Sequence, residues 1–169
     1  MNIISLINQV DSGEIVLPAI QRSFIWSEDK IERLMDSVMR GYPIGIVLMW
    51  ESYKDIQFRS FERVFQPGNR PKFLDNSSKK KLRLVLDGQQ RLQSLYMALF
   101  GKYDQSYLYF DVLSGRESDD FEEEKYHFYF MTPEESEEWN SNCFEEAVGE
   151  LEEDEEREDA SYLSKVPDL

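Results

Sequence analysis

The stretch "LRLVLDGQQRLQSL", residues 82–95, changes its hydrophobic period within a few residues and fixes one supersecondary unit of the fold. Before Asp87, leucines alternate with other residues, as in a strand with one buried face. After Asp87, apolar residues follow the i, i+3, i+4, i+7 spacing of a helix that faces a core. Those positions are Leu92, Leu95, Tyr96 and Leu99, and Gly101 closes the helix. A strand that leads directly into a helix predicts an α/β (α+β) domain.

The flanking sequence predicts further elements of both kinds. Helical spacing begins near Ile3 and stops at Ser12-Gly13, and a second helix is expected between a Ser27 cap and Gly41. Extended segments are expected from residue 15, at 44–50, and in the aromatic stretches "SYLYFDV" and "KYHFYFM". The nearly continuous apolar run 44–50 predicts a strand buried on both faces, and residues 56–58 and 61–65 predict a hairpin.

The size of the chain predicts one core, because 169 residues with 41% apolar content match a single domain. No apolar run approaches the roughly 18 residues of a membrane helix, so we expect a cytoplasmic protein. Cys143 is the only cysteine, which excludes an internal disulfide and a cysteine-based zinc cluster. His127 is the only histidine, and no spacing supports a catalytic triad around it.

Charge divides the chain into two parts. Residues 1–115 hold 15 Lys/Arg and 13 Asp/Glu, whereas residues 116–169 hold 4 Lys/Arg and 21 Asp/Glu. The net charge of -15 therefore belongs to the C-terminal segment. We expect a nucleotide-binding domain at 1–115 and an acidic extension at 116–169, helical or partly disordered and truncated from a longer protein. Nucleic-acid binding stays open because the first part is nearly neutral and contains the basic run "SSKKKLR".

The junction at Asp87 has the composition of an anion site. The first N–H groups of a helix have no intrahelical acceptor, and Gly88 lets a ligand approach the backbone closely. Arg91 lies in the first turn, where its planar guanidinium group suits a phosphate. Asp87 would repel phosphate unless it caps the helix, holds a metal ion, binds a ribose hydroxyl or orients water. The structural alternative is a capped helix start with a solvated Arg91 and two solvated glutamines.

A second polar pair lies within an apolar extended segment. The stretch "LPAIQRSFIW" places Gln21 and Arg22 among aliphatic and aromatic residues. An arginine in such surroundings either forms a partly buried ion pair or belongs to a binding site. Both alternatives remain open from the residues alone.

Taken in order, "LPAIQRSFIWSEDKIERLMDSVMRGYPIGIVLMWE" and "LRLVLDGQQRLQSLYMAL" resemble the N-terminal domain of GmrSD-type restriction proteins, over about residues 3–110. The resemblance implies a ParB/sulfiredoxin-like mixed sheet flanked by helices. It also implies binding and hydrolysis of a nucleoside triphosphate with Mg²⁺, in the service of cleaving modified phage DNA. The alternative is a ParB-like binding switch that responds to nucleotide or DNA without useful hydrolysis.

The resemblance also implies roles for individual residues. Nucleotide binding falls to Gln21, Arg22, Gly88, Gln89 and Arg91. Catalysis falls to Asp87, Gln90 and Arg91, with Asp87 as the metal ligand and Gln90 orienting the motif. DNA is expected to be reached through a nuclease domain or partner absent from this chain, because one histidine cannot build an HNH centre; nuclease activity is not expected of the chain alone.

Two departures from the family accompany the match. Relatives commonly carry Thr where this chain has Gln93, which we interpret as a surface-polar exchange. Sulfiredoxin relatives place a reactive cysteine at the corresponding turn, whereas Cys143 lies far along the chain. Thiol repair chemistry is therefore not predicted.

Other candidate residues have stronger structural interpretations. Trp26 and Trp50 are able to stack on a base, but aromatic residues with aliphatic neighbours are more often core. The lysines 79–81 are able to contact DNA phosphates, but such a run before a strand is more typical of a solvated edge. The acidic stretch 117–159 lacks the glycine-containing loops of a metal site and predicts a solvated helix or tail.

Overall fold

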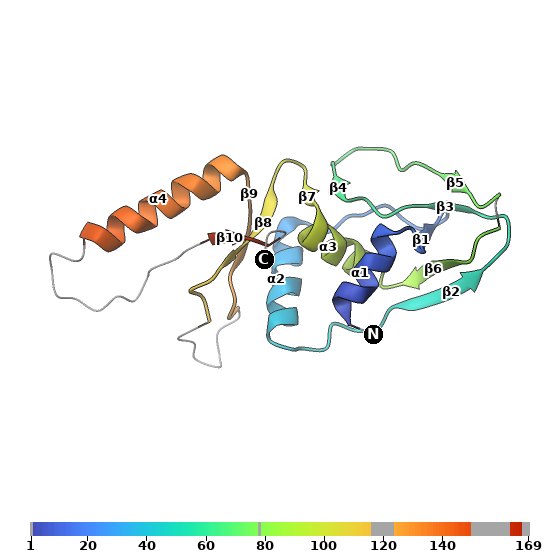
Figure 1. The fold of residues 1–169 in the computed structure, drawn as a ribbon, viewed down its shortest axis with the longest axis horizontal. Coiled ribbons are helices and arrows are strands. Elements are labelled where there is room, and N and C mark those ends of the chain that lie inside the picture. Colours follow the sequence, from blue (N-terminus) through green and yellow to red (C-terminus); the bar gives the residue numbers. More distant parts are fainter. Residues whose placement is uncertain (1, 78, 116–123, 150–162, 167–169) are drawn as a thin grey trace.

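The fold is mixed α+β, as the sequence predicts. A computed structural model describes residues 2–77, 79–115, 124–149 and 163–166, and within them it contains four helices and three sheets (Figure 1). The helices are α1 (Ile3–Asp11), α2 (Glu28–Met39), α3 (Gln89–Phe100) and α4 (Pro133–Gly149). The strands are β1 (Ile15–Pro18), β2 (Leu48–Ser52), β3 (Gln57–Arg59), β4 (Val64–Phe65), β5 (Leu74–Asp75), β6 (Leu82–Asp87), β7 (Lys102–Tyr103), β8 (Tyr107–Asp111), β9 (Phe128–Met131) and β10 (Leu163–Lys165).

The larger sheet has the strand order β2-β6-β1-β3-β5. β1 and β6 run parallel, with Val16 opposite Leu84, and the other pairs are antiparallel. Parallel neighbours end at the same edge of a sheet. The segment that follows β1 and the turn that follows β6 therefore meet, although 65 residues separate them along the chain.

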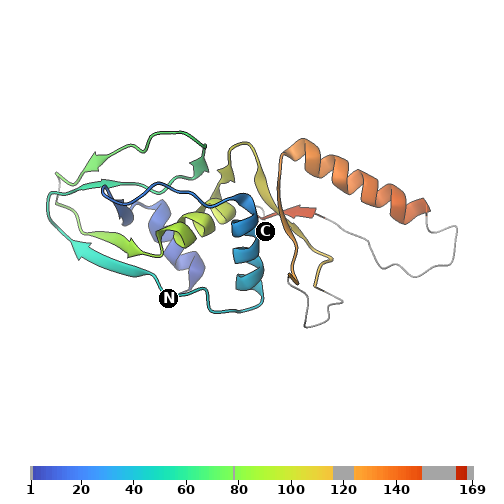
Figure 2. The same cartoon turned by 180° about the vertical axis from the view of Figure 1, so that it is seen from behind.

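Helix α3 lies at the centre of the molecule, between the larger sheet and the three-stranded sheet β10-β8-β9 (Figures 1 and 2). Its residues from Gln89 to Ala98 are buried except Arg91. One apolar core surrounds it, with members such as Ile7 of α1, Val85 of β6 and Leu108 of β8. This continuous core explains why both sheets form around a single helix.

The three-stranded sheet β10-β8-β9, called the smaller sheet below, is attached to α2 through carboxylates. Asp36 accepts hydrogen bonds from the backbone N–H groups of Lys125 and Tyr126, at 3.2 and 2.9 Å. Glu32 accepts another from Phe130, in β9, at 2.9 Å. β9 pairs with β8 across the boundary predicted at residue 115, and β10 pairs with the other side of β8. The first residues of the acidic extension thus complete a sheet begun by the preceding segment.

Two predictions about the larger sheet are wrong. The apolar run 44–50 is not a doubly buried strand: residues 42–47 are irregular, and β2 is an edge strand whose Trp50 is 46% exposed. The predicted hairpin is absent among the described residues, because β3 pairs with β1 and β5 while β4 pairs with β7. Apolar content alone does not distinguish a buried strand from a loop with exposed aliphatic residues.

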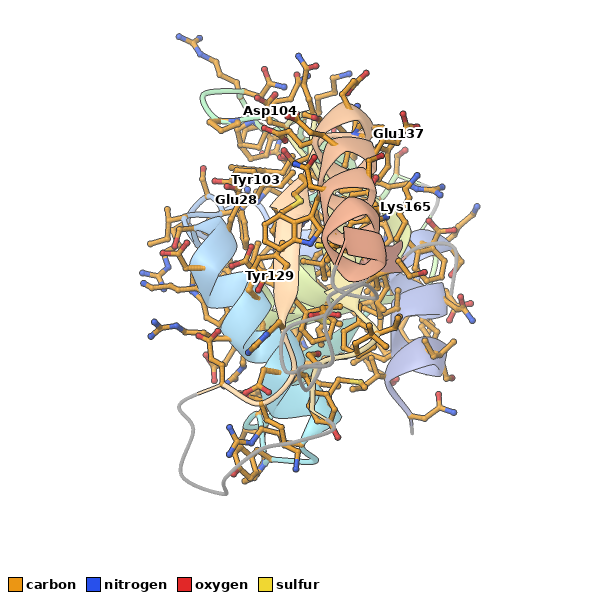
Figure 3. The ribbon with its side chains drawn as sticks, turned by 90° about the vertical axis from the view of Figure 1, so that its left-hand side faces the viewer. Glu28, Tyr103, Asp104, Tyr129, Glu137 and Lys165 are labelled. Atoms are coloured by element: carbon orange, nitrogen blue, oxygen red, sulfur yellow. The ribbon has the colours of Figure 1, made fainter. Side chains whose placement is uncertain are left out.

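A group of acidic residues lies near the start of α2 and the turn after β7: Glu28, Asp29, Asp104 and Glu135. Figure 3 shows Glu28, Tyr103 and Asp104 in one region beside α4. Burial raises the pKa of the Glu28 carboxyl, and the negative charges of Asp29, Asp104 and Glu135 raise it further. This part of the surface is unfavourable for an anionic ligand.

Helix α1 is fixed to α3 by a hydrogen bond from the Tyr96 hydroxyl to Asp11, at 2.8 Å. Burial, aided by Asp11, raises the pKa of Tyr96 from 10.0 to about 12. Tyr96 is an acid whose folded-state pKa lies above its unfolded value, so its contribution to stability is complete below pH 10 and is lost as the pH rises towards 12.

We therefore expect Tyr96→Phe to lower the free energy of unfolding by about 1 kcal/mol at neutral pH. The difference from wild type should shrink between pH 10 and 12. Urea unfolding at several pH values measures both effects, with the exposed Tyr53→Phe as a control. A difference that stays constant over this range would contradict the assigned titration.

Candidate anion-binding site

The two polar motifs of the sequence form one pocket. An open pocket of about 300 Å³ lies at the edge where β1 and β6 end. Its lining contains all seven predicted site residues together with Trp26 and Leu86: Gln21, Arg22, Trp26, Leu86, Asp87, Gly88, Gln89, Gln90 and Arg91. The structure therefore brings together residues that the sequence separates by more than 60 positions.

Gly88, and not Asp87, is the N-cap residue of α3. Its φ of 84° places it in the left-handed region that favours glycine. The Asp87 side chain is 72% exposed and lies 4.0 Å from the Arg91 guanidinium group. The interpretation of Asp87 as a helix cap is therefore wrong, and its carboxylate stands at the mouth of the pocket.

Gln90 holds the segment after β1 against α3. Its side-chain oxygen accepts a hydrogen bond from the Ile25 N–H, and its amide nitrogen donates to the Ser23 carbonyl, both at 3.0 Å. The amide thus pairs with the backbone as a neighbouring strand would. Only 7% of Gln90 is exposed. This geometry shows that Gln90 holds residues 23–25 in place, and its predicted catalytic role stays a prediction.

Gln93 repeats the arrangement one turn further along α3. Its side chain accepts from the Glu62 N–H at 3.0 Å and donates to the Glu62 carbonyl at 2.6 Å. The residue is 4% exposed, so its interpretation as a surface-polar exchange is wrong. A buried amide needs hydrogen-bond partners, and the backbone of residue 62 supplies them.

Arg59 is a site residue that the sequence does not reveal. It is buried in β3 and donates to the carbonyl oxygens of Gln21, at 3.1 Å, and of Arg22. Burial lowers the pKa of the Arg59 guanidinium group, which the nearby Glu62 carboxylate partly counteracts. "QFRS" has the appearance of an ordinary exposed strand, and no local pattern marks this arginine.

Arg22 lines the pocket and has no acidic partner among the described residues. Gln21 donates to the Leu86 carbonyl at 3.0 Å, and Gln89 donates to the Arg22 carbonyl at 3.4 Å, so the backbone at 21–22 is fixed from two sides. Among the described residues, no carboxylate lies within 4.0 Å of the Arg22 guanidinium group. The alternative of a structural ion pair is therefore not realised there.

Arg91 lies between two glycines at the opposite wall. It donates to the Ile46 carbonyl at 2.6 Å. A Cβ atom at Gly45 would lie 2.4 Å from its Nη1 atom, and one at Gly88 would lie 3.2 Å from its Nη2 atom. Arg91 thus links the pocket lining to the segment before β2.

One polar atom of the pocket wall has no hydrogen-bond partner. The Gln89 side-chain oxygen is buried and unpaired among the described residues, as is the Nε atom of Arg59. Native proteins rarely leave such atoms without a partner, and they recur at functional sites. Both residues line a smaller cavity beside the pocket.

The other candidate residues are distributed as follows. Trp26 lines the pocket and packs against the core, whereas Trp50 is exposed on β2. Lys81 pairs with Glu51 at 3.0 Å, at the end of β6 remote from Asp87. Residues 133–149 of the acidic stretch form α4, and residues 117–123 and 150–159 lie outside the described ranges.

The structure is an α+β domain with a pocket at a strand-to-helix junction, and Arg22 and Arg91 are among the residues that line it. The chain matches the family described as "GmrSD restriction endonuclease, N-terminal domain" over residues 3–167, and it belongs to this family. It is also 33% identical over 99 residues to the Methanocaldococcus jannaschii protein named "Uncharacterized protein MJ0686". That match covers 59% of the chain and 17% of the relative, so the chain spans a small part of that protein. No helix among the described residues has the length and apolar character needed to cross a membrane.

The backbone pairing of Gln90 can be tested directly. Gln90→Met preserves the length of the side chain but leaves the Ile25 N–H and the Ser23 carbonyl without partners. We expect a loss of about 1–3 kcal/mol in the free energy of unfolding, since each of the two hydrogen bonds contributes about 0.5–1.5 kcal/mol. Urea unfolding measures this loss, and amide hydrogen exchange should accelerate at residues 22–26. Gln105→Met, in an exposed turn, is the matched control, and equal effects of the two changes would contradict the role of Gln90.

Proposed function

We propose that the pocket binds the phosphates of a nucleoside triphosphate and that the domain hydrolyses this nucleotide as part of a DNA restriction protein. The convergence of Arg22 and Arg91 on the start of α3 carries the proposal. Two guanidinium groups and the unpaired N–H groups of a helix start match the charge and oxygen geometry of a polyphosphate. The pocket volume of about 300 Å³ lies at the lower end of ligand sites.

Each lining residue has a role in this proposal. Arg22 and Arg91 neutralise phosphate charge, and Gly88 lets phosphate approach the backbone. Gln21, Gln89 and Gln90 hold the Arg22 segment in place through the hydrogen bonds described above. Asp87 orients the water that attacks the terminal phosphorus, while the bond to the bridging oxygen breaks and the diphosphate leaves.

The donor groups of the pocket are compatible with Mg²⁺. This ion retains several waters and is commonly held by one or two carboxylates together with substrate phosphates. Asp87 offers one exposed carboxylate at the mouth of the pocket. No group of three or more His, Cys, Asp or Glu side chains suited to a metal occurs in the described residues. When bound, Mg²⁺ would supply further neutralisation of the phosphate oxygens.

A non-hydrolysing nucleotide- or DNA-dependent switch of ParB-like type is the second candidate. The observation in its favour is that Asp87 is the only carboxylate among the described residues that line the pocket, while the Gln90 amide is occupied by backbone groups. A pocket of this kind provides strong binding and few groups for chemistry. Separate measurements of affinity and phosphate release distinguish the two candidates. The membership in the restriction family supports a role in phage defence, with DNA reached through a nuclease domain or a partner.

The arginines provide the test of binding. Arg22→Ala and Arg91→Ala each remove a charge-assisted contact, and we expect each to weaken nucleotide affinity by about 1.5–3 kcal/mol, roughly 10- to 150-fold. Calorimetric titration with each of the four nucleoside triphosphates and Mg²⁺ measures the loss. Arg70→Ala, at an exposed position outside the lining, is the matched control. Wild-type affinity in folded Arg22 and Arg91 variants would overturn the nucleotide site.

Asp87 separates binding from hydrolysis. Since Gly88 is the N-cap residue, Asp87→Asn should leave the melting temperature nearly unchanged. We expect it to retain most of the affinity but to lose phosphate release by at least tenfold, because the neutral amide neither holds Mg²⁺ nor accepts a proton from water. Asp55→Asn is the exposed control. Phosphate release equal to that of wild type would favour another catalytic group, and its absence from wild type would favour the switch.

A further inference from the structure

Residues 42–47, which join α2 to β2, contact the pocket through their backbone. Ile44 and Val47 pack against the core, whereas the Ile46 side chain is 75% exposed. Between these two anchors, the carbonyl of Ile46 accepts the hydrogen bond from Arg91. The 46–47 peptide unit, which contains this carbonyl, is therefore held by the guanidinium group of a residue that belongs to the proposed phosphate site.

Gly45 makes this contact possible. A Cβ atom there would lie 2.4 Å from Nη1 of Arg91, closer than real Cβ atoms approach, and 3.1 Å from its Cζ atom. Gly41, at the other end of the segment, has a similar left-handed backbone with φ of +70°, but a Cβ atom there would meet nothing within 4 Å. The two glycines share the conformational requirement, and only Gly45 has the contact with Arg91.

The segment leads directly into the edge strand of the larger sheet. Leu48 pairs with Asp87, and the register shifts between Leu48 and Met49. The side chains of Leu48 and Trp50 are 53% and 46% exposed. A displacement at residues 45–46 would therefore change the start of an exposed, partly apolar strand.

We propose that Arg91 couples phosphate binding to residues 45–48, with Gly45 as the positioning residue that allows this coupling. The proposal rests on the phosphate site proposed above. A guanidinium group donates a stronger hydrogen bond to a phosphate oxygen than to a neutral carbonyl oxygen, because the phosphate carries a negative charge. A bound polyphosphate draws Arg91 away from the Ile46 carbonyl, and the 46–47 peptide unit then moves with the start of β2. The occupancy of the pocket is thereby transmitted to the sheet edge.

The test uses the whole chain and inorganic tripolyphosphate with Mg²⁺ as the probe. Gly45→Ala should strengthen binding at least threefold relative to Gly41→Ala, since both replace a glycine of positive φ and only the former already displaces Arg91 from the Ile46 carbonyl, a contact that the bound phosphate otherwise has to break. In an Arg91→Ala background, Gly45→Ala should change binding by less than twofold. Equal affinities of the two alanine variants, or an undiminished effect of Gly45→Ala without Arg91, would overturn the role of Gly45.

Hydrogen exchange of the wild-type protein provides a measurement that needs no variant. Exchange in a peptide that covers residues 42–50 should increase at least twofold when tripolyphosphate is added, while the core of α3 stays protected. Unchanged exchange at saturating probe would overturn the coupling. Loss of affinity in Arg22→Ala with no difference between the Gly45 and Gly41 variants would refute this coupling alone. Probe affinity unaffected by both arginine changes would refute the phosphate site itself.

Discussion

The pairing of the Gln90 side chain with the backbone of Ser23 and Ile25 is the interaction on which the pocket depends. Residues 21–27 have no helix or strand of their own, so their backbone groups need partners elsewhere. The buried amide of Gln90 meets this need and is satisfied in return. Arg59 adds two hydrogen bonds, to the carbonyl oxygens of Gln21 and Arg22. Gln93 in turn pairs with the backbone of residue 62, three positions after Arg59. The irregular segment that carries Arg22 thus has a defined position.

The parallel alignment of β1 and β6 is the second requirement, since it brings two distant chain segments to one edge of the sheet. Burial of Arg59 at this edge is unfavourable for stability, because it disfavours the charged guanidinium group and so lowers its pKa. Carbonyl oxygens of residues 21 and 22 offset part of that cost. A buried guanidinium group under the Arg22 segment adds positive potential to the pocket. The Nε atom of Arg59 has no hydrogen-bond partner among the described residues, which lowers the stability of the fold.

Patterns with a local period were predicted from the sequence, and features created by tertiary contact were not. The apolar spacing of residues 3–10 and 92–99 specifies α1 and α3, and alternation at Leu82 and Leu84 specifies β6. The burial of Gln93 and Arg59 depends on backbone groups of remote segments, which no periodicity encodes. The prediction of a buried strand at residues 44–50 failed for a related reason. Its residues 45–46 serve as a backbone contact for Arg91, so Ile46 stays exposed despite its apolar character.

The acidity of the chain does not preclude an anion site, because charge acts locally in salt solution. The net charge is -15, yet the charged residues of the pocket lining are Arg22, Arg91 and Asp87. At physiological ionic strength the Debye length is about 8 Å, so exposed carboxylates beyond that distance are largely screened. The carboxylates of Asp36 and Glu32 are in addition occupied by backbone N–H groups of the smaller sheet. Carboxylates therefore hold α2 and the three-stranded sheet together, while two arginines and one aspartate line the pocket at the junction between β6 and α3.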